Sequence, residues 1–171
     1  MRTLYLLRHA KSSWSDPTLP DRERPLAPRG RRDAQRVGEH LVRLAIVPDL
    51  VLCSSARRAG ETFELVQTAL WPTTSVLLEP QLCAASADHL LDRLRVVPDG
   101  VASVLVIGHN PGLQDLALRL ASAGADLERL EAKFPTAALA TLALPEATWS
   151  QLSPADAVLD AFVAPKQLRR A

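Results

Sequence analysis

The sequence contains few of the features that mark secreted, membrane or nucleic-acid-binding proteins. It has only two cysteines, Cys53 and Cys83, and a formal net charge of +1 at pH 7. Two cysteines do not make the disulfide framework of a small secreted protein, and so small a charge gives no overall field for nucleic acid or anionic membranes. No apolar run approaches the ~20 residues that a membrane-spanning helix needs.

The amino-terminal residues do not resemble a signal peptide, because a predicted strand begins almost at Met1 with no long apolar segment or cleavage site. We therefore expect a cytoplasmic protein that binds neither membranes nor nucleic acid. Hydrophobic residues make up 47% and charged residues 23% of the 171 residues, which is typical of a soluble globular domain. We expect one domain over residues 1–171, present as a monomer, with Cys53 as a buried thiol in an apolar run.

Apolar segments alternate with segments of helical periodicity through the first 124 residues. Strands are predicted at residues 4–7, 50–53, 75–79 and 103–108. The predicted helices are residues 30–45, a helix with Ala59, Thr62, Phe63, Val66, Ala69 and Leu70 on its apolar face, one through Leu90, Leu91 and Leu94, and one through Leu113, Leu116, Ala117 and Leu120 that closes at Gly124. A serine at position 54 or 55 can cap the second of these helices.

The remaining segments are less regular. Residues 12–29 contain four prolines, so we predict an irregular loop, and because it leaves from the end of the first strand we interpret it as a wall of a site. Residues 137–144 are predicted as a strand, and 149–152 and 158–163 as shorter antiparallel strands at the sheet edge. The predicted fold class is α/β, a three-layer α/β/α sandwich with a mostly parallel central sheet.

Polar side chains follow the predicted parallel strands at their carboxyl ends. Arg8 and His9 end the first strand, residues 54–58 the second, Glu79 the third and His109 the fourth. Right-handed crossovers bring these ends to one edge of the sheet, where ligands bind in α/β folds. Helices beginning after Ser55 and His109 would turn their amino termini toward the same edge and favour an anion.

Arginines and histidines at one crevice suit a phosphoryl group. Guanidinium groups bind its oxygens in bidentate fashion, a neutral imidazole can attack phosphorus, and a protonated imidazole can stabilise the equatorial oxygens. The sequence has no nucleotide-binding loop and no metal-ligand spacing. We therefore expect neither a metal ion nor another cofactor.

Three motifs resemble those of the histidine phosphatase superfamily, whose fold is phosphoglycerate mutase-like. Leu7-Arg8-His9-Ala10 resembles its Arg-His-Gly signature, residues 54–62 its Ser-x-x-x-Arg-Ala-x-x-Thr block, and residues 106–111 its second histidine block. Arg24-Pro25-Leu26 with Gly30, together with residues 79–82 and 133–136, look like the small SixA-type phosphohistidine phosphatases. The resemblance covers nearly the whole chain.

The resemblance implies that His9 is the nucleophile that becomes phosphorylated, that Arg8 and Arg58 bind the phosphate, and that His109 completes the pocket. Arg58 is preferred to Arg57 because it directly precedes Ala59, as the family's block requires.

The motifs do not identify the residue that would donate a proton to the leaving group. Some branches carry an acid directly after the second histidine, where this chain has Asn110, and others carry a glutamate after the third strand, for which Glu79 is the nearest match. Glu79 is thus a candidate acid, although a carboxylate at a strand end can equally cap or pair with an arginine. Lys11 and Ser15 are candidates for the rim of the phosphate site.

The resemblance and the residues together favour a metal-independent phosphatase that hydrolyses phosphohistidine on a protein through phospho-His9. A phosphoramidate bond needs less help from an enzymic acid than an ester, and the chain has no large insertion that could form a lid. The alternatives are a phosphatase of small phosphate esters, a mutase, a non-catalytic phosphohistidine-binding module, and a metalloenzyme built on His9, His109 and Cys53. Trp14, which follows Arg8 and His9 closely in the sequence, is a candidate to cover the substrate.

Overall fold

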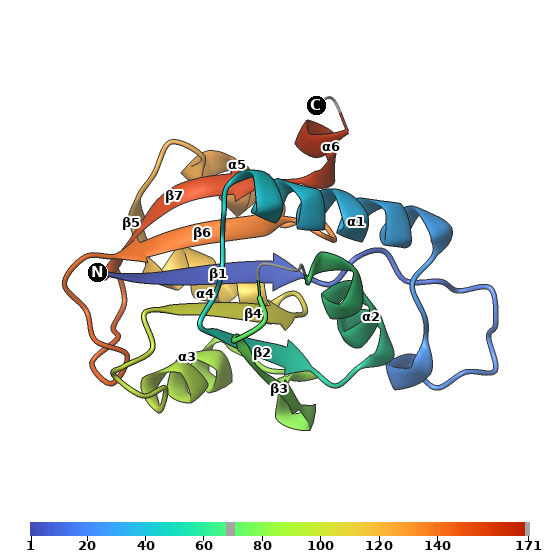
Figure 1. Ribbon diagram of the computed structural model, residues 1–171, viewed down its shortest axis with the longest axis horizontal. Helices are drawn as coiled ribbons and strands as arrows, with labels where there is room; N and C mark the ends of the chain where they lie inside the picture. Colours follow the sequence, from blue (N-terminus) through green and yellow to red (C-terminus); the bar gives the residue numbers. More distant parts are fainter. Residues whose placement is uncertain (68–70, 170–171) are drawn as a thin grey trace.

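The computed structural model describes residues 1–67 and 71–169. One mixed sheet lies between two layers of helices (Figure 1). The strands are β1 (Arg2–Arg8), β2 (Leu50–Ser54), β3 (Ser75–Glu79), β4 (Ser103–Gly108), β5 (Ala121–Ala123), β6 (Leu139–Leu144) and β7 (Ala157–Val163). The helices are α1 (Pro28–Arg43), α2 (Arg57–Val66), α3 (Ala87–Arg95), α4 (Gly112–Leu120), α5 (Leu127–Ala132) and α6 (Pro165–Leu168), with 3-10 turns η1 (Asp21–Glu23) and η2 (Pro80–Leu82).

The sheet has the strand order β3-β2-β4-β1-β6-β7-β5. β3, β2, β4 and β1 are mutually parallel, so their carboxyl ends lie at one edge, as the alternation of strands and helices predicts. β6 is antiparallel to β1, and β7 is antiparallel to β6. The three-layer α/β fold with a mostly parallel sheet is confirmed. β6 and β7 pair antiparallel as predicted for the edge, and the short β5 pairs parallel with β7.

Alternate residues of the central strands face opposite layers of helices. On β4, Val104 and Val106 belong to the core shared with α3, α4 and α5, whereas Leu105 and Ile107 belong to the core shared with α1 and α2. The side chains of a strand point alternately to the two faces, and helices cover both faces here. This explains why β4 is apolar throughout instead of alternating between apolar and polar residues.

Two predicted strands, Ser75–Glu79 and Ser103–Gly108, have the predicted bounds. Two other predictions were wrong. Residues 149–152 form a turn. The apolar side chain of Trp149 is buried in this turn, where its indole N–H donates to the carbonyl of Val101 at 2.7 Å. The fourth helix ends at Leu120, and β5 lies between it and Gly124, where a positive φ of 152° suits glycine.

Other elements differ at their ends or were not anticipated. α1 is displaced by two residues from the predicted 30–45, β6 begins two residues later than predicted, and α2 ends at Val66. Ala69 and Leu70, predicted on the apolar face of this helix, lie outside the described residues. The short elements α5, α6 and β5 were not predicted, because each is too short for a periodic pattern.

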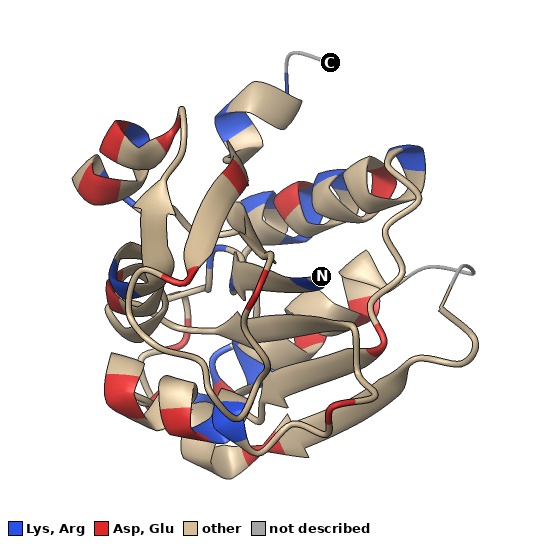
Figure 2. Ribbon diagram, turned by 90° about the vertical axis from the view of Figure 1, so that its left-hand side faces the viewer, with Lys and Arg blue, Asp and Glu red and all other residues tan. Residues whose placement is uncertain are grey.

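Charged residues are distributed without separation by sign. Figure 2 shows basic and acidic residues interspersed along the helices, in agreement with the net charge of +1. Among the residues that the structure describes, no helix has the length and apolarity to cross a membrane.

Substitution of Gly30 by alanine is expected to lower the free energy of unfolding. Gly30 lies in α1 against the backbone of the segment that follows β1. An added Cβ at this position would overlap the carbonyl oxygen of Lys11. Overpacking of this kind costs about 1–3 kcal/mol, and urea unfolding of Gly30→Ala measures it.

Gly60 provides a matched control in α2. A Cβ at Gly60 meets no heavy atom within 4 Å, and alanine favours a helix interior by up to about 1 kcal/mol over glycine. Gly60→Ala should therefore be as stable as the unsubstituted protein or slightly more stable. A Gly30→Ala protein as stable as Gly60→Ala would contradict the close approach of α1 to Lys11.

Candidate active site

The carboxyl ends of the parallel strands open into a cavity of about 500 Å³. Of the residues predicted from sequence, Arg8, His9, Lys11, Arg58 and His109 all line it. The loop after β1 forms one wall, as expected from its prolines and its point of departure. The rings of the two histidines lie 5.1 Å apart between centroids, so segments 100 residues apart in the chain meet at one place.

His9 is a buried, neutral imidazole with a defined tautomer. Its Nδ1 lies 2.7 Å from the carbonyl oxygen of Ala10, which can only accept, so Nδ1 carries the proton and Nε2 keeps its lone pair. Burial is the main cause that lowers the pKa of His9 to about 3, and the charges of Arg58 and Arg8 act in the same direction. The result is a nucleophilic nitrogen that stays unprotonated near neutral pH.

Thr62 ties His9's strand to the helix that carries Arg58. The backbone N–H of Ala10 donates to Thr62 Oγ1 at 3.0 Å, and this hydroxyl donates to the carbonyl of Arg58 at 2.7 Å. Thr62 is fully buried. The threonine of the second motif therefore has a structural role, because it sets the start of α2 relative to the end of β1.

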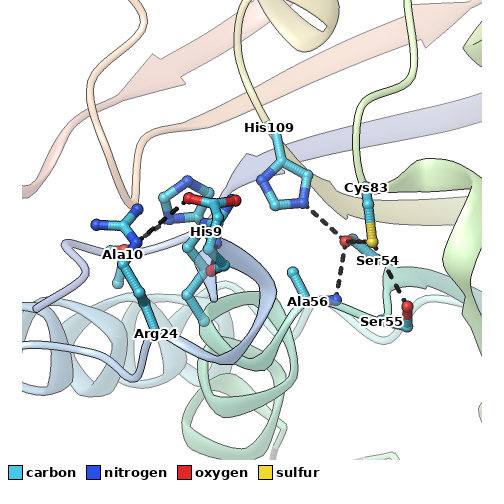
Figure 3. A network of polar contacts seen from close by, with 10 residues as sticks. His9, Ala10, Arg24, Ser54, Ser55, Ala56, Cys83 and His109 are labelled. Atoms are coloured by element: carbon cyan, nitrogen blue, oxygen red, sulfur yellow. Dashed lines mark hydrogen bonds and ion pairs between the residues drawn. The ribbon is translucent and has the colours of Figure 1, made fainter. Parts of the chain in front are cut away.

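His109 is oriented by the second motif as well. Its Nε2 lies 2.7 Å from Ser54 Oγ, and Ser54 donates to Cys83 Sγ at 3.4 Å, as Figure 3 shows. Ser54 thereby fixes the orientation of the His109 ring. Burial, followed by the charge of Arg58, lowers the pKa of His109 to about 4.

The predicted cap of α2 by Ser54 or Ser55 was wrong. The helix begins at Arg57 after Ala56, which has no side chain that could cap it, and Ser54 accepts from the backbone N–H of Ala56 at 3.2 Å. The hydroxyl is thus committed to the site, where it holds the ring of His109.

Arg8 and Arg58 approach the cavity from β1 and α2. Arg8 Nη1 donates to the carbonyl of Phe134 at 2.9 Å, which fixes the direction of its guanidinium group. Arg58 is buried and lines the cavity, whereas Arg57 is exposed and pairs with Glu61 at 3.1 Å. The geometry therefore agrees with the choice of Arg58 over its neighbour.

Arg24 is a third guanidinium group in the cavity that sequence reasoning did not select. It is only 7% exposed, and its Nη1 has no hydrogen-bond partner among the described residues. Arg24 belongs to the Arg24-Pro25-Leu26 segment of the proline-rich loop. The signal available from sequence was thus the combination of that motif with the prediction that the loop walls the site.

Asp21 neutralises part of this positive charge. Its carboxylate accepts from Arg58 Nη2 at 3.0 Å and lies 3.3 Å from Arg24 Nε. Burial alone would raise the pKa of Asp21, but the hydrogen bond and charge of Arg58 outweigh it and hold the pKa below its usual value. Asp21 is therefore an ionised partner of the arginines and a poor proton donor.

Two candidates from the sequence lie outside the cavity. Glu79 forms a bidentate pair with Arg93, whose Nη2 donates to Oε1 at 2.7 Å and whose Nε donates to Oε2 at 2.9 Å. Ser15 is exposed and shares a hydrogen bond with Ser13 at 2.9 Å. Glu79 thus pairs with an arginine, which was the other interpretation of a carboxylate at that strand end.

The position after the second histidine also lacks an acid. Asn110 donates to the carbonyl of Phe134 at 3.2 Å, and its side-chain oxygen accepts from the backbone N–H of Gln114 at 3.3 Å. These contacts hold the first turn of α4, whose amino terminus at Gly112 lines the cavity. A carboxylate missed from sequence, that of Asp115, is exposed at the rim.

The described residues contain no cluster of three or more histidine, cysteine or acidic side chains that could hold a metal ion. Cys53 is fully buried, and burial is the main cause that raises its pKa to about 12. A thiol in that environment is a packing group, in agreement with the interpretation from sequence.

Comparison with known proteins gives the family. Residues 4–84 match the model of the histidine phosphatase superfamily, branch 1. An uncharacterized protein of Mycobacterium tuberculosis is 37% identical over 164 residues, which are 94% of this chain and 100% of that protein. The chain therefore belongs to the histidine phosphatase superfamily, and this membership supports a phosphatase, a hydrolase of phosphate bonds.

Two of the solved structures that share this fold are SixA-type by name. A protein of Nakamurella multipartitia, assigned as phosphohistidine phosphatase SixA, aligns with a TM-score of 0.83 and 28% identity over 96% of each chain. One of Agrobacterium tumefaciens with the same assignment has a TM-score of 0.80 and 27% identity over 96% of this chain and 98% of that one. The expectation of a phosphoglycerate mutase-like, SixA-type protein is confirmed at the level of family and fold.

The buried histidines predict how stability depends on pH. Below pH 6.5 an unfolded histidine binds a proton that His9 in the folded protein does not bind until about pH 3. Stability is therefore lost as the pH falls from 6.5, by up to about 1.4 kcal/mol per pH unit and per histidine. His9→Asn should lose less stability than the unsubstituted protein between pH 7 and 5, measured by urea unfolding.

His89 is the matched control because it is an exposed histidine, on α3. His89→Asn leaves the burial of His9 unchanged, so it should keep the contribution of His9 to the pH slope. Equal slopes for His9→Asn and His89→Asn would contradict a neutral, buried His9.

Proposed function

We propose that this chain is a phosphohistidine phosphatase that works through a covalent phospho-His9 intermediate. The observation that carries the proposal is the neutral His9 with its proton fixed on Nδ1 by Ala10, in a cavity lined by Arg8, Arg24 and Arg58. Such a site offers a nucleophile and several bidentate donors to one phosphoryl group.

The first step transfers the phosphoryl group to the enzyme. His9 Nε2 attacks phosphorus, an N–P bond forms, and the N–P bond to the substrate imidazole breaks with its electron pair left on the departing nitrogen. A proton already present on the other ring nitrogen makes the leaving group neutral imidazole. Arg8, Arg58 and a protonated His109 bind the equatorial oxygens as charge develops there.

The second step releases phosphate. Water attacks phosphorus of phospho-His9, the N–P bond breaks, and the electron pair returns to Nε2. The products are inorganic phosphate and one proton, so His9 is again neutral and ready for another cycle. The phosphate dianion favours a protonated His109 while it is bound, because an adjacent negative charge raises a histidine pKa.

Two candidate acids, Asp21 and Glu79, are poorly suited to protonate a leaving group, which supports a phosphoramidate substrate over an ester. An ester leaves as an alkoxide, which needs a proton from the enzyme. Asp21 is held ionised by Arg58, and Glu79 is occupied by Arg93 outside the cavity. A leaving imidazole has no such requirement.

The rim of the cavity supports a phosphoryl group presented by another protein. Lys11, Trp14 and Asp115 line the cavity and are exposed. A substrate on a protein surface reaches such a rim without a lid closing over it. The names of the two SixA-type structures point to the same class of substrate for those proteins.

Trapping of the intermediate tests this proposal. A peptide carrying 32P-phosphohistidine, mixed with the protein and quenched in alkali within milliseconds, should leave an acid-labile label on His9. His9→Ala should show no label and a kcat at least about 10³-fold lower, because the nucleophile is lost. Treatment with EDTA should leave the rate unchanged.

Other outcomes have definite meanings. Binding of the peptide without label or phosphate release would favour a non-catalytic binding module. Faster turnover of phosphoserine peptide or small phosphate esters than of phosphohistidine would favour an ester phosphatase. Loss of activity with EDTA, restored by a metal ion, would contradict the proposed mechanism.

Glu79→Gln is expected to separate stability from catalysis. It removes a charge-assisted pair between side chains that are only 12% and 21% exposed, so the free energy of unfolding should fall by about 1–3 kcal/mol. The kcat for phosphohistidine should stay within about twofold. Arg93→Gln, which breaks the same pair from the other side, is the control and should behave alike. A tenfold loss of kcat in Glu79→Gln alone would make Glu79 the proton donor.

A further inference from the structure

Trp14 is an exposed aromatic side chain on the rim of the active-site cavity. It is 70% exposed, although the centre of the Arg24 guanidinium group lies only 3.5 Å from the centroid of its ring. Arg24 thus covers one face of the indole and leaves the opposite face open. Among the cavity-lining residues that the structure describes, Trp14 is the one aromatic side chain besides the two histidines.

Contact with Arg24 on one face holds the indole in place. Arg24 is itself buried, and stacking of a guanidinium group on an indole is a favourable contact. The loop that carries both residues is closed at its base, where Ser13 N–H donates to the Pro25 carbonyl at 2.8 Å and Ala27 N–H to the Lys11 carbonyl at 2.9 Å. A side chain so placed loses little further entropy when a ligand stacks on it.

In-line transfer defines where the leaving group lies. The attacking Nε2 of His9 and the leaving nitrogen take opposite apical positions on phosphorus. Because His9 is buried at the base of the cavity, the leaving group points toward the mouth. The arginines bind the equatorial oxygens, so the rim is left to contact the substrate beyond phosphorus. Residues 84–86, which also line the cavity, carry only small side chains.

We propose that the open face of Trp14 stacks on the imidazole ring of the substrate phosphohistidine and thereby selects it over phosphoryl groups on aliphatic side chains. This inference rests on the proposed function and names the residue that decides its substrate. Stacked aromatic pairs are favoured over simple burial, and the proton on the second ring nitrogen adds a cation–π attraction. Trp14 is a specificity-determining residue with no part in the bond changes.

A pair of substrates isolates this contact. Phosphohistidine peptide and phosphoramidate share the N–P bond, but only the peptide has a ring. For Trp14→Ala the kcat/KM for the peptide should fall about tenfold relative to that for phosphoramidate, a ratio that corresponds to about 1.4 kcal/mol. Trp14→Phe should restore most of the ratio, and Trp14→Leu should not, because leucine is apolar without an aromatic face.

The substrate ratio also separates stacking from support of Arg24. An indole that only holds Arg24 would predict equal losses on both substrates in Trp14→Ala, and that result would overturn the inference. No loss on either substrate would also overturn it. So would a ratio restored as completely by leucine as by phenylalanine. Leu44→Ala, at an exposed apolar position outside the cavity lining, is the control and should leave the ratio unchanged.

Failure of the inference differs from failure of the proposed function. If the unsubstituted protein forms labelled His9 and hydrolyses both N–P substrates while the Trp14 variants keep its ratio, only the role of Trp14 is wrong. If the unsubstituted protein hydrolyses neither N–P substrate, the proposed function itself is wrong and the role of Trp14 falls with it.

Discussion

The carboxyl end of β1 is held by backbone hydrogen bonds from both of its neighbours. His9 N–H donates to the carbonyl of Gly108 at 3.0 Å at the end of β4, and Arg8 N–H donates to the carbonyl of Ala138 at 3.1 Å. Ala137, with a φ of 59°, returns its own N–H to the carbonyls of Arg8 and His9. Arg8 and the proposed nucleophile His9 are thus a continuation of the central strand, with little freedom to move independently of the sheet.

This rigidity allows an arrangement that electrostatics alone would disfavour. Three guanidinium groups, those of Arg8, Arg24 and Arg58, share one cavity with two imidazoles, and Asp21 pairs with two of them, Arg24 and Arg58. The site keeps both imidazoles neutral because burial and nearby positive charge oppose their protonation. The phosphoryl dianion of the proposed substrate would reverse that balance, so the charge of the cavity is complementary to such a ligand.

How much could be predicted differs between the sheet and its periphery. β3 and β4 were predicted to the residue because a short apolar run bounded by polar or turn-forming residues has a definite length. The same reasoning wrongly predicted a strand at residues 149–152, because an apolar residue such as Trp149 can be buried in a turn as well as in a strand. The motifs led to Arg8, His9, Arg58 and His109, and the structure brings all four into one cavity.

Local sequence determined the alternation of strands and helices, and with it which residues stand at strand ends, because these depend on periodicity and on where the apolar runs stop. It did not determine the partners of side chains that cross between elements. These partners depend on how separate segments pack against each other. Examples are the ion pair of Glu79 with Arg93, the stacking of Arg24 on Trp14 and the hydrogen bond between Ser54 and His109. Such contacts are decided by packing in three dimensions, and only the tertiary structure contains them.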